Sequence, residues 1–189
     1  MLWFFGDPHF HHANIIKYSK RPFKHVTEMN DTIIQNINDV VTERDLLYCL
    51  GDWCWAYDKR QLLRIARELR DRIKCRDVRL IYGNHDREEI KSVFTTARDM
   101  ERVKYNDNGE QQEIVLCHYA MRVWNKSHHG AWHLYGHSHG SLKDDPHSLS
   151  FDVGVDCHDY KPVSYDQVKA IMSKKVWKPI DHHGARDHE

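Results

Sequence analysis

Short apolar runs alternate with amphipathic segments in the first half of the chain. Apolar residues at helical spacing predict one helix over residues 30–41, with Asn30 or Asp31 as its N-cap, and another over residues 58–74. Apolar runs at residues 2–5, 45–50 and 78–82 predict buried strands, each ended by glycine. Strands that alternate with helices indicate an α/β fold with helices outside the sheet.

The second half is dominated by short strands, which the pattern places at residues 114–117, 132–135 and 151–155. Residues 106–110 predict a hairpin turn, and residues 165–175 predict a closing helix with Ser164 as N-cap. No repeat or Pro/Gly-rich linker divides the 189 residues. We therefore expect a single domain over residues 1–178, followed by a flexible, histidine-bearing tail over residues 179–189.

Composition narrows the class of protein. Lys+Arg and Asp+Glu both number 28, so no overall basic field argues for nucleic-acid binding as the main role. There is no apolar run of the ~20 residues that a membrane-spanning helix needs, and no signal peptide, so we expect no membrane association and a cytoplasmic location. Five scattered cysteines fit reduced thiols better than disulfides. Histidine, with 16 copies, is the outlier.

Potential metal ligands follow the predicted strands in five clusters. The clusters are Asp7-Pro8-His9, Gly51-Asp52, Gly83-Asn84-His85-Asp86, Cys117-His118 and Gly136-His137-Ser138-His139. They combine carboxylate, imidazole and amide donors and need no thiolate, a mixture that suits Mn²⁺, Fe, Ni²⁺ or Zn²⁺ better than Mg²⁺ or Ca²⁺ alone. One bridging carboxylate would hold two ions about 3.5–4 Å apart. Each motif alone is weak, but their joint occurrence in order is a strong signal.

These motifs resemble the calcineurin-like metallophosphoesterases, and the resemblance runs from Leu2 to about Val168. The first motif, which continues as Phe10-His11-His12-Ala13-Asn14-Ile15-Ile16, is similar to that of small stand-alone bacterial and phage members, as is Asp152-Val153-Gly154-Val155-Asp156. The resemblance implies a four-layer α-β-β-α sandwich of two mixed sheets flanked by helices. It also implies two divalent metal ions, with Mn²⁺ favoured over Fe, Ni²⁺ or Zn²⁺.

The family's roles carry over by position. Asp7, His9 and His139 would hold the first metal; Asp52 would bridge; Asn84, His118 and His137 would hold the second. His85 would be the catalytic histidine that protonates the leaving oxygen or stabilises its charge, with Asp86 as its orienting partner. A metal-activated hydroxide would attack phosphorus.

The expected substrate is a phosphodiester of a nucleotide or nucleic acid. The protein phosphatases of this superfamily follow Gly-Asp with Val-Asp-Arg-Gly, whereas Gly51-Asp52 is followed here by Trp53-Cys54-Trp55-Ala56, without the phosphate-clamping arginine. A small chain without a cap domain would also leave an open site. The alternatives are a phosphomonoesterase of small molecules and a non-catalytic scaffold or binding protein with this fold.

For several residues near these clusters, the sequence fits both a functional and a structural role. His12 and Asn14 fit substrate contact as well as helix capping. Trp53 and Trp55 could stack a base, although packing in the loop is the commoner role of tryptophan. A basic stretch of Lys17, Lys20, Arg21, Lys24 and His25 is typical of a solvated face, although it could attract a polyanion. His11 fits an exposed loop position, and Cys54 and Cys117 fit packing better than ligation.

Overall fold

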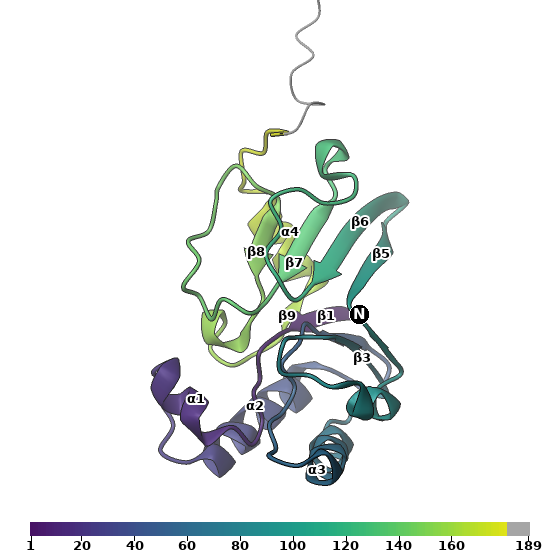
Figure 1. The fold of residues 1–189 in the computed structure, drawn as a ribbon. Helices are drawn as coiled ribbons and strands as arrows, with labels where there is room; N and C mark the ends of the chain where they lie inside the picture. The colour runs from purple at the N-terminus through teal and green to yellow at the C-terminus, as the bar shows by residue number, and fades with distance from the viewer. Residues whose placement is uncertain (181–189) are drawn as a thin grey trace, which may run out of the picture.

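The computed structural model describes residues 1–180, and two mixed sheets form its centre (Figure 1). The first sheet has the order β4-β3-β2-β1-β9, with four parallel strands and an antiparallel β9. The second has the order β5-β6-β7-β8, in which only β5 runs antiparallel to its neighbour. The strands are β1 (Leu2–Phe5), β2 (Leu46–Cys49), β3 (Asp77–Ile81), β4 (Thr96–Arg98), β5 (Met100–Asp107), β6 (Glu110–Cys117), β7 (Trp132–Tyr135), β8 (Ser150–Asp152) and β9 (Val163–Ser164).

The helices of the first half of the chain cover the first sheet on the side away from the second (Figure 1). The α-helices are α1 (Ala13–Tyr18), α2 (Val26–Val40), α3 (Lys59–Asp71) and α4 (Tyr165–Met172), and the short 3₁₀ turns are η1 (Glu88–Val93), η2 (Ser127–His129) and η3 (Val155–Cys157). The first sheet has a hydrophobic core on each face. Adjacent residues of one strand belong to different cores, because side chains alternate across a sheet. Phe5 packs with Ile33 of α2 and Leu69 of α3, whereas Phe4 packs between the sheets with Leu134.

Helix α4 adds Val168 and Met172 to the core between the sheets. Between β6 and β7, the ring of Trp124 lies 5.3 Å from that of His133 on β7, centroid to centroid. The predicted α/β fold with two mixed sheets and flanking helices is confirmed. The tail predicted for residues 179–189 lies, from residue 181 onward, outside the described residues. Across the described residues, no helix combines the length and hydropathy needed to cross a bilayer.

Most predicted elements are present, and the differences have local causes. Helix α2 begins at Val26 rather than near Asn30, because the apolar stripe already starts with Val26 and Met29. Asn30 is buried, and its side chain accepts a hydrogen bond from the backbone N–H of His11. The strand predicted for residues 151–155 ends at Asp152, where the chain turns into η3. Helix α4 ends at Met172, three residues before its predicted end.

The capping of α4 gives a test of this fold. Ser164 and Gln167 form a capping box, in which each side chain accepts a hydrogen bond from the other residue's backbone N–H. We expect Ser164→Ala to lower the free energy of unfolding by about 1 kcal/mol in urea titrations. Ser173→Ala removes an exposed hydroxyl from the other end of α4 and serves as the control, with an expected change below about 0.5 kcal/mol. Equal losses in the two variants would contradict this role of Ser164.

Candidate metal centre

The five predicted clusters lie on loops that leave the carboxyl ends of parallel strands. Asp7 and His9 follow β1, Asp52 follows β2 and Asn84 follows β3, whereas His118 follows β6 and His137 and His139 follow β7. Backbone hydrogen bonds join the loops, from Asp7 N–H to Gly51 O at 3.0 Å and from Gly136 N–H to His118 O at 3.0 Å. Parallel strands of both sheets therefore direct their donors into one region.

Left-handed backbone is concentrated at these loops. Among the seven predicted ligands, five have positive φ between 47° and 66°, namely Asp7, His9, Asp52, His137 and His139. Such conformations cost on the order of 1–3 kcal/mol each for residues other than glycine, and they occur where the surrounding structure imposes them. The strain thus lies at the residues that carry the donors.

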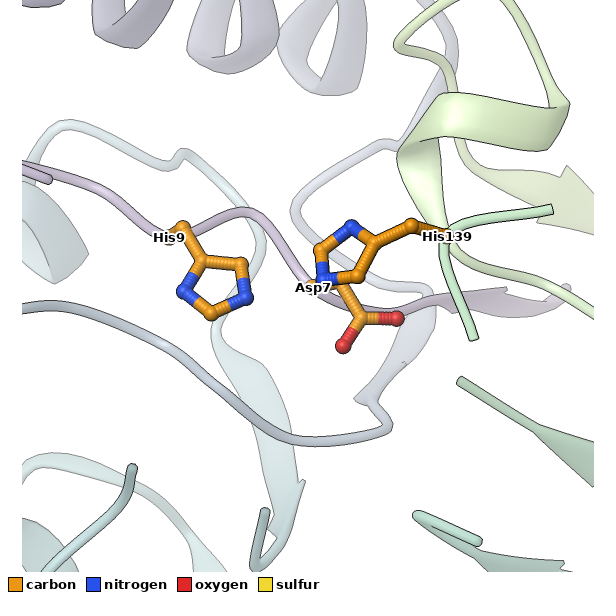
Figure 2. A group of neighbouring side chains, drawn as sticks. All are labelled: Asp7, His9 and His139. Carbon is orange, nitrogen blue, oxygen red and sulfur yellow. The ribbon is translucent and has the colours of Figure 1, made fainter. Parts of the chain in front are cut away.

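The donors form two groups. Ligand atoms of Asp7, His9 and His139 all lie within 4.8 Å of one another, as do those of Asp52, His118 and His137. Figure 2 shows the first group, with the rings of His9 and His139 beside the carboxylate of Asp7. These two rings stack with centroids 5.1 Å apart. Each group has the size and composition of a site for one divalent cation.

Asp52 links the two groups. Its Oδ2 atom lies 3.4 Å from His9 Nε2 and 3.6 Å from His118 Nε2. Its Oδ1 atom accepts a hydrogen bond from the backbone N–H of His85 at 2.9 Å, which fixes the orientation of the carboxylate. One carboxylate oxygen therefore faces a nitrogen of each group, the position that a bridging ligand requires.

The protonation of His118 shows that a cation fits between the donors. His118 Nδ1 lies 2.7 Å from Leu50 O and must donate its proton to that carbonyl. Burial lowers the pKa of His118, so the ring is neutral and Nε2 carries a lone pair. That lone pair faces Asn84 Oδ1 at 3.2 Å and Asp52 Oδ2, which are both acceptors. Three acceptors that converge without a proton between them fit a shared metal ion.

His9 supports the same conclusion for the first group. Its Nε2 atom is buried and has no hydrogen-bond partner among the described residues. Burial, followed by the charges of His139, Arg21 and His85, lowers the pKa of His9, so this ring is also neutral. A buried imidazole nitrogen without a partner is costly unless a metal ion binds it.

Acidic groups crowd the same region. Burial and then the neighbouring charges of Asp52 and Asp152 raise the pKa of Asp7 well above its usual range. Both oxygens of Asp7 accept from the backbone N–H of His137, at 3.0 and 2.9 Å. Divalent cations would relieve the repulsion between these carboxylates.

Arg21 corrects one prediction, because it belongs to no solvated face. Its side chain is fully buried and makes a bidentate pair with Asp156, at 2.8 Å from Nε and 2.7 Å from Nη2. The same guanidinium donates to the backbone carbonyls of Asp7 and Pro8, at 2.7 and 2.9 Å. Asp156 in turn holds His139 Nδ1 at 2.7 Å, which leaves His139 Nε2 for the first group. Although burial opposes ionisation, the hydrogen bonds from His139 and Arg21 lower the pKa of Asp156.

Asp86 differs from its expected role as the partner of the His85 imidazole. Its carboxylate accepts three backbone N–H groups, from Asp52 and Gly83 through Oδ2 and from Trp53 through Oδ1, at 2.8–2.9 Å. Burial raises the pKa of Asp86 to about 7, and these hydrogen bonds oppose that rise. Asp86 therefore holds the loops after β2 and β3 together. Among the described residues its carboxylate accepts from backbone N–H groups and not from the His85 imidazole.

Two glycines are required by close approach. A Cβ atom on Gly83 would lie 2.2 Å from Asp52 Oδ1. Gly51 has φ of +98°, and a Cβ atom there would lie 2.3 Å from His118 Nδ1. The glycine that precedes the donor in these clusters thus makes room for a ligand from another loop.

The structure distinguishes between the two roles for some of the residues near the clusters. His12 is at the N-cap position of α1 without a side-chain capping bond, and its ring stacks on Trp55 with centroids 5.1 Å apart. Asn14 and His11 are exposed. Trp53 is fully buried against Phe10, so packing is its role. Neither metal-ligand group found among residues 1–180 includes cysteine, and all five cysteines are free.

The second group opens into a cleft of about 700 Å³. Its walls come from three parts of the chain. These are α1 with the residues that follow it, the loop after β7, and the residues that follow β2 and β3. The lining residues include Tyr18, Lys20, Asp52, Asn84, His85, His137 and Ser141. His85 lies beside both the cleft and the first group, because its ring centroid is 5.4 Å from that of His9.

The sequence carries a weaker signal for Arg21 and Asp156, which hold the ligands in place, than for the ligands themselves. Arg21 lay in a run of basic residues that is typical of a surface, and only its contacts with Asp7 and Asp156 reveal its place. Asp156 was visible as part of a family motif, but no spacing connected it with His139. The two mixed sheets and the two groups of donors agree with the fold and the metal groups that the resemblance implied.

The chain is similar in sequence to one known protein and in fold to another. No family model matches the sequence. An uncharacterized protein of Methanocaldococcus jannaschii is 34% identical over 186 residues, which cover 95% of this chain and 96% of that protein. The crystal structure of a protein of unknown function from Aquifex aeolicus aligns with a TM-score of 0.64 and 24% identity, over 90% of this chain and 98% of that one. This likeness shows that the two proteins share a fold.

A solved archaeal phosphodiesterase aligns with 81% of this chain and 82% of its own, at a TM-score of 0.38 and 16% identity. This likeness is too distant to support a conclusion about this chain.

The place of Asp52 between the groups predicts a shared loss of metal. We expect Asp52→Asn to reduce Mn²⁺ binding at both sites together, because the amide removes the charge that faces His9 and His118. Isothermal titration and metal analysis after dialysis would measure the bound ions per chain. Asp144→Asn, at an exposed position, serves as the control. Loss of one ion with the other unaffected would contradict the bridging position.

The buried contacts of Arg21 predict an effect on the first group. Lysine keeps the charge but cannot form the bidentate pair. We therefore expect Arg21→Lys to weaken Mn²⁺ binding roughly 10–100-fold at one of the two sites, that of the first group. Asp156→Asn should weaken the same site, and the exposed Arg72→Lys should weaken neither. Circular dichroism would confirm that each variant is folded. Unchanged affinities in folded Arg21→Lys and Asp156→Asn would show that this contact does not position His139.

Proposed function

We propose that this chain, which belongs to the same family as the Methanocaldococcus jannaschii protein, is a binuclear metal-dependent phosphoesterase that prefers phosphodiesters. The position of Asp52 carries the proposal, since one oxygen faces a nitrogen of each donor group. Seven donors that the sequence singled out lie together in that arrangement. Phosphoryl transfer needs chiefly such a concentration of positive charge and correct positioning.

Two divalent cations in these groups would neutralise charge on the phosphate and supply an activated water. Asp7, His9 and His139 would hold one of them, Asn84, His118 and His137 the other, and Asp52 both. The nitrogen and oxygen donors favour Mn²⁺, with Fe, Ni²⁺ and Zn²⁺ as alternatives.

The remaining side chains divide between chemistry and support. His85 lines the cleft, so its imidazole can donate a proton to the leaving oxygen of a substrate bound there. Asp86 supports this step indirectly, because it fixes the backbone at Asp52 in the loop after β2 and at Gly83 in the loop after β3. Arg21 and Asp156 hold the loop after β1 and the ring of His139 in place.

The open cleft favours a diester over a small monoester. It extends from the donors along α1 and the loop after β7, so there is room for groups on both sides of a phosphate. Nucleotides or nucleic-acid ends are therefore the proposed substrates. A scaffold without turnover is disfavoured, because such a protein would have no need to keep a complete donor set with strained backbone at five ligands.

Turnover of an activated diester tests this proposal. We expect Mn²⁺-loaded protein to hydrolyse bis(p-nitrophenyl) phosphate and a chelator to abolish the activity. His85→Ala should lower kcat by roughly 10²–10⁴ for substrates with poor leaving groups, while metal content stays near that of the wild type. His147→Ala, an exposed histidine outside the site, is the matched control.

Two outcomes would overturn parts of the proposal. Full metal occupancy without turnover of mono- or diesters would favour the scaffold. A loss of metal in His85→Ala would place His85 among the ligands.

A further inference from the structure

A row of aromatic rings leads from the metal centre to the protein surface. His85 and His12 lie nearest the centre, with ring centroids 5.4 and 5.5 Å from that of His9. Trp55 stacks on His12 and meets His85 edge-on at 5.7 Å. These rings come from the loops after β1, β2 and β3, so the row is a product of the tertiary structure.

Two exposed tyrosines extend this row into solvent. Tyr57 meets Trp55 edge-on with centroids 6.2 Å apart and is 89% exposed. Tyr18 of α1 meets His12 at 6.4 Å and is 73% exposed, and it lines the cleft. Single exposed aromatic residues are common, but a connected group beside a cleft is typical of a binding surface.

The chemistry of this surface indicates its ligand. Exposed rings bind other flat π systems, and nucleobases are the flat rings that accompany phosphodiesters. The net charge of zero gives little long-range attraction for a polyanion, so stacking would have to supply much of the affinity. Lys20 lines the same cleft and provides one local positive charge for a flanking phosphate.

We propose that Trp55, Tyr57 and Tyr18 form a base-binding subsite, which takes an unpaired nucleobase attached to the scissile phosphodiester. The proposal rests on the proposed function for its substrate class but depends on different residues. A base within a duplex has both faces covered, so the subsite would select mononucleotide esters and single strands over duplexes.

The test uses two esters with the same leaving group. Thymidine 5′-(p-nitrophenyl phosphate) carries a base, whereas methyl p-nitrophenyl phosphate does not. We expect the wild type to prefer the thymidine ester in kcat/KM, and Tyr18→Ala/Tyr57→Ala to reduce that preference about tenfold. Tyr18→Phe/Tyr57→Phe keeps both rings and should keep the preference. Trp55 is left in place because its ring contacts His85.

Equilibrium binding separates this subsite from catalysis. Fluorescence anisotropy would compare a labelled oligothymidylate with an abasic oligomer of equal length and charge, and with a duplex. We expect the wild type to prefer the oligothymidylate over both, and the double alanine variant to lose about tenfold of the preference over the abasic oligomer. A mononucleotide competitor would show whether one base suffices.

The outcomes distinguish the two proposals. Turnover of both esters with equal kcat/KM in all variants would overturn the subsite and leave the phosphoesterase intact. Ring-dependent binding without turnover would support the subsite and overturn the enzyme. Equal binding of oligothymidylate and the abasic oligomer by the wild type would overturn the subsite irrespective of activity.

Discussion

Repulsion between buried carboxylates is the constraint on which the centre of this protein depends. Asp7 and Asp52 lie at the ends of the neighbouring parallel strands β1 and β2, and both are almost fully buried. Burial and the charge of Asp52 raise the pKa of Asp7, and the adjacent imidazoles of His9 and His118 are neutral. The buried guanidinium of Arg21 is paired with Asp156, so divalent cations are the natural counter-charge for Asp7 and Asp52.

The loops around these carboxylates are held by a second set of polar contacts. Asp86 accepts backbone N–H groups on the β2 and β3 loops, and Arg21 binds the backbone of the β1 loop. Arg21 also reaches Asp156, which orients His139. A network of this kind fixes ligand positions and offsets the strain of left-handed backbone, because it joins one loop to the next through hydrogen bonds. The β-strands position the loops, and these contacts position the side chains.

The same loops present two different surfaces to a substrate. The donor groups and His85 form a polar centre, whereas Trp55 with its neighbours forms an aromatic margin on one side. A phosphodiester has both kinds of group, a charged phosphate and flat or apolar substituents. Because the aromatic surface adjoins the polar centre, the site favours substrates in which phosphate and base are joined.

The sequence by itself predicted strands β1, β2, β3, β6, β7 and β8, the hairpin turn, helix α3, the Ser164 cap of α4 and the candidate donor residues, because periodicity and glycine-bounded clusters are local signals. Only the tertiary structure decided that Asp86 holds backbone rather than an imidazole, and that Arg21 is buried. It also separated buried Trp53 from partly exposed Trp55, two residues apart. These features join segments up to 135 residues apart, and neither hydropathy nor spacing encodes contacts at that separation.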